Sequence, residues 1–573
     1  MKLHRAFLTT VLVAQLGTAG CSNSASADSP GGAPGPSGGG TATGSGGATG
    51  SGGPSGEGGN SAGSGGATAL PPETERESSY EVPVATGRFV WIANPTSGRV
   101  AYVDATTLDV HTVEAGNAPT YLAPIPSATD DAVIVLNVLS DDATVLRAHG
   151  ATLSNQTIKG LAHGANAWVV SADGQWAIAW TDATRVAQAA PTQGFQDISI
   201  LNLATTDATK MKTVVAVGYR PAVVAFAADG KRAFAVTEDG ISIVDLTAAA
   251  GPTVARNTAL TDDPTLDADT RDVSITPDGR LAIIRREGSS ALGIVDLTSG
   301  ALTSLDLGGA ITDVDLTASG DRAVAVVREL SAVVIVPLTA GAPTADTLTR
   351  IDIPGETIGS VVLASNGKVA VLYSNATIAE RLTVLSLDAT PDYHVVKLHG
   401  PVLSVFPTPD GQNAVVIHRA VPSTPTNVDA GASADGGGHA DAGAPTPPPE
   451  PTAAPAFSLV PLTGNLPARL QDTGTPPTAV AIAPASNRAL VTVLDSVHQT
   501  YGVYLGSFPS LAVTLFPLAS PPISVGVVAG ASRGFVAQQH PEGRITFVGL
   551  DSGDARTLTG FELGARVVDW SQP

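Results

Sequence analysis

The feature that most constrains the fold is a tight-turn dipeptide that recurs along the middle of the chain. It is a glycine preceded by Asp, Asn or Ser, and successive glycines are 56, 49, 41, 47 and 44 residues apart. Glycine accepts the positive φ angle that tight turns need, and Asp or Asn stabilises such turns. The six copies are Asp173-Gly174, Asp229-Gly230, Asp278-Gly279, Ser319-Gly320, Asn366-Gly367 and Asp410-Gly411. A repeat of this period predicts one small unit stacked many times, not a series of unrelated domains.

Short apolar runs surround each turn. In the unit around Gly279, the run 271–275 precedes the turn, and the runs 282–284 and 293–297 follow it. The runs are rich in Val and Ile and are bounded by Gly, Pro, Asp and Thr, which is typical of β-strands. Similar runs begin near residues 88, 132, 487 and 532 and extend the series to about ten units between residues 80 and 573.

Units of about four short strands predict an all-β fold, a β-propeller of about 8–10 four-stranded blades in one ring or two propellers. A single blade cannot cover its own two faces, so blades must stack around an axis. Gly564–Trp570 is similar to the strand-like run 218–226 that precedes a turn, so a C-terminal strand could complete the first blade and leave no free sheet edge. Tyr80–Val84 is the local alternative for the same place.

These motifs resemble the YVTN and lactonase-like superfamily of propeller repeats. The best match is Thr276-Pro-Asp-Gly279 followed by Leu281–Ile284 and Gly293–Leu297, and the resemblance covers most of residues 85–570. It implies the propeller fold. For function it implies at most a lactonase-like hydrolase or a quinoprotein-type dehydrogenase, and the chain has no matching set of catalytic residues.

The N-terminus predicts export and lipid anchoring. Met1–Arg5 is basic, and Ala6–Leu16 is apolar but too short to span a bilayer. The small residues before Cys21 resemble a bacterial lipobox, which implies a signal peptide at 1–20 and acylation of Cys21. It also implies a lipid anchor in the bacterial cell envelope, at the outer membrane on its periplasmic or surface face. Ordinary secretory cleavage after Ala27 is the alternative, and it would discard Cys21.

Two tracts predict disorder because they can bury too little apolar surface to offset chain entropy. The first is a Gly/Ser-rich linker at 21–79, in which no aromatic residue occurs from Ser22 to Leu70. The second, 421–456, is an insertion within the 80–573 propeller domain, because the strand pattern resumes after it.

Composition excludes several classes of function. The formal charge of −21 gives no basic surface for nucleic acid. A single cysteine cannot form an intramolecular disulfide or a thiolate metal cage. The chain therefore predicts no cofactor.

An acidic cluster at Asp262, Asp263, Asp267, Asp269 and Asp272 is a solvated loop in the simplest interpretation. Asp267 and Asp269 start like a calcium loop, but Arg271 interrupts the register.

Propellers place ligands at loops that lead into their innermost strands. If the runs before each turn are those strands, six residues line one face: Asn117, His163, Tyr219, Arg220, Arg271 and Asp272. Arg220 and Arg271 could clamp a carboxylate or phosphate, or they could form inter-blade ion pairs. With no catalytic set in the sequence, we expect a non-catalytic binding or scaffolding module whose partner is an envelope protein or a glycan. The lactonase-like or quinoprotein enzyme is the alternative.

Overall fold

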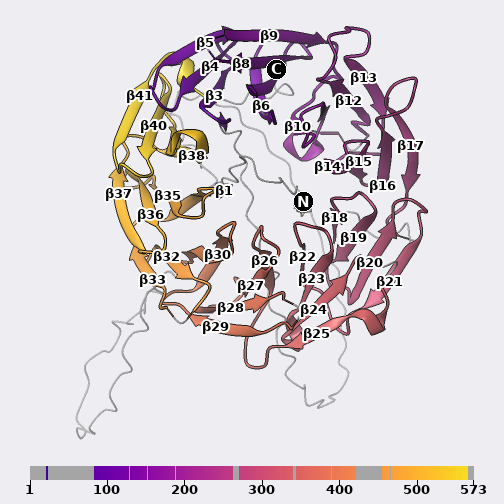
Figure 1. Ribbon diagram of the computed structural model, residues 1–573, viewed down its shortest axis with the longest axis vertical. Coiled ribbons are helices and arrows are strands. Elements are labelled where there is room, and N and C mark those ends of the chain that lie inside the picture. The colour runs from indigo at the N-terminus through magenta and orange to yellow at the C-terminus, as the bar shows by residue number, and fades with distance from the viewer. Residues whose placement is uncertain are drawn as a thin grey trace, which may run out of the picture. The chain divides into compact units, whose positions relative to one another are not determined.

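The chain folds into ten antiparallel β-sheets, which we call blades 1 to 10 (Figure 1). The computed structural model describes residues 21–22 and 83–565, except for 128, 151, 187–188, 191, 262–269, 340–342, 389, 421–453 and 465. Each blade is four strands hydrogen-bonded in sequence order, and blade 9 has the short β1 as a fifth strand. The predicted all-β propeller is confirmed, at the upper end of the predicted blade number.

The first five blades span residues 84–306. Blade 1 contains β2 (Val84–Ala85), β3 (Phe89–Asn94), β4 (Arg99–Asp104) and β5 (Val110–Glu114); blade 2 contains β6 (Pro119–Ile125), β7 (Asp131–Asn137), β8 (Asp142–His149) and β9 (Thr152–Lys159); blade 3 contains β10 (Ala167–Val170), β11 (Trp176–Trp180), β12 (Asp197–Asn202) and β13 (Lys212–Ala216); blade 4 contains β14 (Val223–Phe226), β15 (Arg232–Thr237), β16 (Gly240–Asp245) and β17 (Thr253–Thr258); blade 5 contains β18 (Arg271–Ile275), β19 (Leu281–Arg286), β20 (Ala291–Asp296) and β21 (Leu302–Asp306).

The second five blades span residues 313–559. Blade 6 contains β22 (Asp313–Leu316), β23 (Arg322–Val327), β24 (Ala332–Pro337) and β25 (Thr349–Asp352); blade 7 contains β26 (Ser360–Leu363), β27 (Val369–Tyr373), β28 (Arg381–Ser386) and β29 (Tyr393–Lys397); blade 8 contains β30 (Val402–Pro407), β31 (Asn413–His418), β32 (Ala456–Pro461) and β33 (Arg469–Asp472); blade 9 contains β34 (Pro477–Ile482), β35 (Arg488–Asp495), β36 (Thr500–Ser507) and β37 (Ala512–Pro517), with β1 (Cys21–Ser22) beside β34; blade 10 contains β38 (Pro522–Val528), β39 (Arg533–Gln538), β40 (Arg544–Gly549) and β41 (Ala555–Thr559).

The helices named here are single 3-10 turns: η1 (Ala183–Arg185), η3 (Arg328–Leu330), η4 (Ala345–Thr347), η5 (Ala529–Ala531) and η6 (Phe561–Leu563). Among the residues described, no helix has the length and apolar character needed to cross a membrane.

The strand order gives the propeller two different faces. First strands lie nearest the centre and fourth strands at the rim (Figure 1). Because the strands of a blade alternate in direction, the connections between second and third strands emerge on the same side as the connections from one blade to the next. We call this side the loop face. The opposite side, with the first-to-second and third-to-fourth connections, is the turn face.

The predicted turn dipeptides all lie between the first and second strands of their blades, on the turn face. Their glycines, Gly174, Gly230, Gly279, Gly320, Gly367 and Gly411, have φ between 64° and 69°. That narrow range is the left-handed region that side chains with a Cβ disfavour. The interpretation of these dipeptides as tight turns is confirmed.

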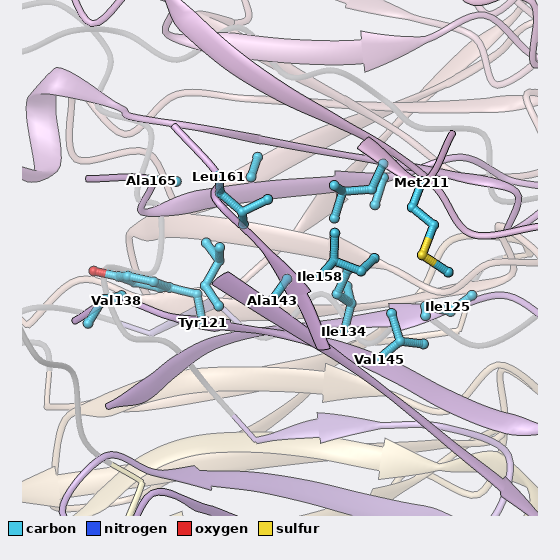
Figure 2. Close-up of a cluster of buried hydrophobic side chains, with 14 of the residues drawn as sticks. Tyr121, Ile125, Ile134, Val138, Ala143, Val145, Ile158, Leu161, Ala165 and Met211 are labelled. Atoms are coloured by element: carbon cyan, nitrogen blue, oxygen red, sulfur yellow. The ribbon is translucent and has the colours of Figure 1, made fainter. Parts of the chain in front are cut away.

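Apolar side chains fill each seam between neighbouring blades. Figure 2 shows the seam of blades 2 and 3, where Tyr121, Ile134 and Ile158 from blade 2 pack against Leu161 and Met211. Full burial of a side chain such as Ile134 contributes about 1.5–3 kcal/mol to folding. The strands alternate in the direction of their side chains, so each blade supplies one set to the preceding seam and another to the following one.

The ring closes between blades 10 and 1 by the same kind of packing. Phe535 and Phe547 of blade 10 lie in one cluster with Ile92 and Val103 of blade 1. The structure therefore shows one ring of ten blades, not two propellers.

The first place in blade 1 is taken by β2, which overlaps the local alternative Tyr80–Val84 at Val84. The closing strand predicted at Gly564–Trp570 lies mostly outside the described residues and stays a prediction. β2 lies only a few residues before β3, and the short connection lets the two strands pair directly, Val84 with Trp91. Residues 566–573 lie outside the described residues, as do the predicted signal peptide, most of the predicted linker, and the predicted insertion up to residue 453.

Arginines that follow the turns join neighbouring blades on the turn face. Arg280 of blade 5 donates a hydrogen bond to the carbonyl of Leu338 in blade 6, and Arg322 of blade 6 donates to that of Leu387 in blade 7. Arg488 Nε donates to the Leu550 carbonyl over 2.8 Å. In these three blades the residue or second residue after the turn therefore also provides a hydrogen bond to the following blade.

Candidate functional site

All six residues predicted to line one face lie on the loop face. Asn117, His163, Tyr219 and Arg220 are in connections between blades, and Arg271 and Asp272 begin the innermost strand β18. They come from the connections that lead into blades 2 to 5, so they are spread along part of the ring.

Arg220 holds the long loop between β11 and β12. Its Nε donates to the carbonyl of Gln193 over 3.2 Å, and its Nη2 donates to that of Ala190 over 3.0 Å. Nη1 lies 3.7 Å from the Glu238 carboxylate. The backbone of Arg220 is in the left-handed region at φ 48°, and its N–H donates to the carbonyl of Gly194 over 2.8 Å. The three hydrogen bonds join the start of blade 4 to the loop of blade 3.

Arg271 makes a similar contact from blade 5 to blade 4. Its Nη2 donates to the carbonyls of Thr237 and Glu238 over 2.6 and 2.8 Å. Both acceptors lie at the end of β15, where the chain leaves the sheet. Both arginines therefore donate hydrogen bonds to carbonyl oxygens of the preceding blade. Binding of a carboxylate or phosphate by these arginines stays a prediction.

Asp272 forms an ion pair with Arg285, which lies directly opposite on β19. Arg285 is also close enough to the buried carboxyl of Asp313 in blade 6 to lower its pKa. Asp313 is not among the residues predicted from the sequence, because it lies in an apolar run that indicates only a strand. An Asp-x-Asp pattern inside an apolar strand is the signal that could have marked it.

Two exposed histidines on the loop face are oriented by carboxylates. His163 Nδ1 lies 2.8 Å from Asp141, and His498 Nδ1 lies 2.6 Å from Asp495. The backbone N–H and the ring of His498 lower the pKa of Asp495, so this carboxylate is ionised near neutral pH and the Nδ1–H donates to it. Nε2 of His498 is then the ring nitrogen left for other partners.

Asn117 lines a shallow groove of about 430 Å³ between blades 1 and 2. The groove is formed by the turn 95–98 and the loop 114–117. Asn117 is exposed there, and its carbonyl accepts a hydrogen bond from the Leu139 N–H over 3.3 Å. Its position suits contact with a polar ligand or partner.

Large apolar side chains are exposed on the loop face, a feature that the sequence analysis missed. Ile378 and Val497, in loops between second and third strands, are 67% and 83% exposed. The other such residues on this face are Leu139, Leu330 and Phe561. An apolar residue inside a polar loop, as in Asp495-Ser-Val-His-Gln499, can mark an exposed apolar side chain in the sequence. It becomes informative once the topology shows that the loops between second and third strands share one face.

Blade 8 contains a buried Ser–His pair that the sequence analysis did not identify. His418 Nε2 lies 2.7 Å from Ser458 Oγ, and Nδ1 lies 3.3 Å from the carbonyl of Pro401. Burial lowers the pKa of His418. His418 is 2% exposed and Ser458 is fully buried, so the pair links two strands of the blade and has no access to a substrate from solvent.

Nothing in the described part of the chain brings three or more His, Cys, Asp or Glu side chains together closely enough to hold a metal ion. Asp267 and Asp269, the weak cation candidates, lie outside the described residues, as do Asp262 and Asp263. Cys21, the predicted lipidation site, is in β1, whose backbone pairs with Val480 of β34.

No family model and no curated protein matches the chain. Similar solved structures include hydrazine synthase of Kuenenia stuttgartiensis, which is 19% identical with a TM-score of 0.30 and covers 58% of this chain and 100% of that chain. They also include dihydro-heme d1 dehydrogenase in complex with DHE (13% identity, TM-score 0.35, 78% of each chain) and a eukaryotic initiation factor (11%, 0.38, 83% of this chain and 97% of that chain). Similarities this weak carry no argument about function. Membership of the YVTN and lactonase-like superfamily stays a prediction, whereas the propeller itself is evident from the ten blades.

Proposed function

We propose that this protein is a lipoprotein of the bacterial cell envelope, anchored through acylated Cys21, whose propeller is a non-catalytic binding or scaffolding module. The observation that carries the binding role is the set of exposed apolar side chains on the loop face, with Ile378 and Val497 the most exposed. Loops on a rigid scaffold are the usual place for binding residues.

Exposed apolar side chains favour association, because removing their apolar surface from water lowers the free energy by about 25 cal/mol per Å². Leu139, Ile378, Val497 and Phe561 are all more than half exposed. Side chains of this type suit the surface of an envelope protein better than the hydroxyl groups of a glycan.

The arginines of the loop face support a scaffold role in another way. Arg220 and Arg271 donate to carbonyls of the preceding blade, which fixes loops of blades 3 and 4 on the same face as the apolar residues. A rigid set of loops loses little conformational entropy when it binds.

Site-specific photo-crosslinking in the native envelope tests the binding role. A photoreactive amino acid at Ile378 or Val497 is expected to give discrete crosslinked products. The matched control is Leu466, which is 62% exposed but lies on the turn face. Equal crosslinking at Leu466, or none at the two loop-face positions, would contradict the proposal.

Palmitate labelling tests the anchor. The mature protein is expected to incorporate labelled palmitate and to partition into detergent, and Cys21→Ser should abolish both. A mature N-terminus at Asp28 would show that ordinary secretory cleavage had removed Cys21.

Metal and quinone analysis with a lactonase assay tests the enzymatic alternative. The purified mature protein is expected to hold no stoichiometric transition metal or quinone and to leave a panel of lactones intact. Lactone turnover that disappears in Arg220→Gln, Arg271→Gln or Asp272→Asn would contradict the scaffold role and support a hydrolase.

A further inference from the structure

The innermost strand of blade 7 is held by two carboxylates from blade 6. The N–H of Val361, in β26, donates to Asp313 Oδ2 over 2.8 Å, and the N–H of Leu363 donates to Asp315 Oδ2 over 3.0 Å. Ala364, the next residue, donates instead to Val369 within blade 7. The two amides therefore belong to the edge of β26 that does not pair with β27, and the carboxylates take the place of a neighbouring strand.

Each carboxylate also binds its own strand. Asp313 Oδ1 accepts the N–H of Val314 over 2.8 Å, and Asp315 Oδ1 accepts that of Leu316 over 2.9 Å. A third bond crosses the same seam, from Thr312 Oγ1 to the carbonyl of Gly359, over 2.7 Å. We call the carboxylates of Asp313 and Asp315, with the two β26 amides they accept, the clasp.

The carboxylates of the clasp are close to each other in the seam. Asp313 is 9% exposed, and Asp315 lies two residues along β22 and so on the same side of the strand. Arg285 of β19 is a cation near Asp313, and it is also paired with Asp272 of β18. β26 contributes amides but no charged side chain.

Burial, with a smaller contribution from the like charge of Asp315, raises the pKa of Asp313 to about 7 against the opposing effects of the Val361 and Val314 amides and of Arg285. The site therefore favours one proton on the carboxylate pair in the acid range. Ionisation of both groups places two negative charges in a poorly solvated seam, where repulsion between them is strong.

We propose that the clasp is a pH-sensitive joint, which holds blade 7 tightly against blade 6 at mildly acidic pH and loosens the seam as the pH rises to neutrality. A carboxyl group that is protonated in the closed seam and ionised in the open one gives up its proton on opening. Opening is therefore favoured as the proton concentration falls, until the closed form has also lost the proton.

Hydrogen–deuterium exchange on the full-length protein tests the clasp. After correction for intrinsic exchange rates, the opening constant of peptides covering β26 is expected to rise on the order of tenfold from pH 6 to pH 8, and to change little from pH 8 to pH 9. Peptides covering β14, the corresponding strand of blade 4, serve as the internal control. Unchanged protection of β26 between pH 6 and pH 8 would overturn the proposal.

Two variants separate titration from simple structural damage. Asp313→Asn cannot ionise, so the rise in β26 exchange between pH 6 and pH 8 should disappear even if its basal exchange is faster. Asp315→Asn removes the like charge and lowers the pKa of Asp313, so the rise should level off at a lower pH and be smaller between pH 6 and pH 8. A wild-type pH profile in both variants would show that another group controls the seam.

Discussion

Asp313 in the seam of blades 6 and 7 and His418 inside blade 8 show one physical effect with opposite results. Both side chains are buried, and burial disfavours the charged form of each. For the acid, the charged form is the deprotonated one, so its pKa rises. For the histidine, the charged form is the protonated one, so its pKa falls.

The two residues therefore affect stability in opposite directions with pH. The folded protein binds a proton at Asp313 more readily than the unfolded chain does, so this contribution declines from the ordinary Asp range up to about pH 7 and then levels off. The folded protein binds a proton at His418 less readily, so that contribution is complete above pH 6.5 and is lost as the pH falls below it. Below pH 6.5 the contributions of Asp313 and His418 partly cancel. The free energy of unfolding of the whole protein therefore changes less with pH than either contribution alone.

Asp313→Ala should cause the largest loss of stability among the substitutions that test this comparison. It leaves the amides of Val361 and Val314 without their acceptor in a buried seam, and each such loss costs about 1–3 kcal/mol. We expect a loss of about 2–4 kcal/mol in the free energy of unfolding at pH 6, measured by urea denaturation. The matched control is Asp346→Ala on the exposed η4, which should change stability by less than about 0.5 kcal/mol. Equal effects of the two substitutions would mean that the clasp contributes nothing.

His418→Gln should unmask the pH dependence of Asp313. Gln can keep a hydrogen bond to Ser458 but cannot take up a proton, so the contribution that weakens in acid disappears. The midpoint of thermal unfolding of this variant should fall steadily from pH 5 to pH 7, whereas the wild-type midpoint changes less. Asp313→Asn should show the reverse, with a midpoint that rises up to about pH 6.5. Parallel curves for the three proteins would contradict the assignment of both groups.

The sequence predicts those parts of the fold that depend on neighbours along the chain. The six turns depend on a glycine within a few residues of each strand, and all six glycines have the expected positive φ. In blades 9 and 10 the first turn has Ser486 and Ser532 at φ 60° and 47° in place of glycine. Neither turn contains the Asp-Gly, Asn-Gly or Ser-Gly dipeptide, so only their apolar runs marked these two units.

The candidate site was less predictable because its contacts join residues that are distant in the sequence. The bond between Val361 and Asp313 crosses 48 positions, and that between Arg220 and Ala190 crosses 30. Such contacts depend on how one blade is aligned with the next, and the repeat period varies too much to fix that alignment. The pattern could place Arg271 on the loop face, but its carbonyl partners were visible only in three dimensions.

Arg271→Gln should have the smallest effect, and its effect should not depend on pH. The guanidinium stays charged throughout the accessible range, and it donates to the carbonyls of Thr237 and Glu238 in the preceding blade. Gln is shorter and cannot reach both acceptors, so we expect a loss of about 1 kcal/mol that is the same at pH 5.5 and pH 8. Arg350→Gln, on an exposed outer strand, is the control and should be nearly neutral. A loss that grows in either direction of pH would place Arg271 in the same electrostatic network as Asp313. Unchanged stability combined with weaker crosslinking from Ile378 would instead assign Arg271 to partner binding, because a residue that only joins two blades must lower stability when it is removed.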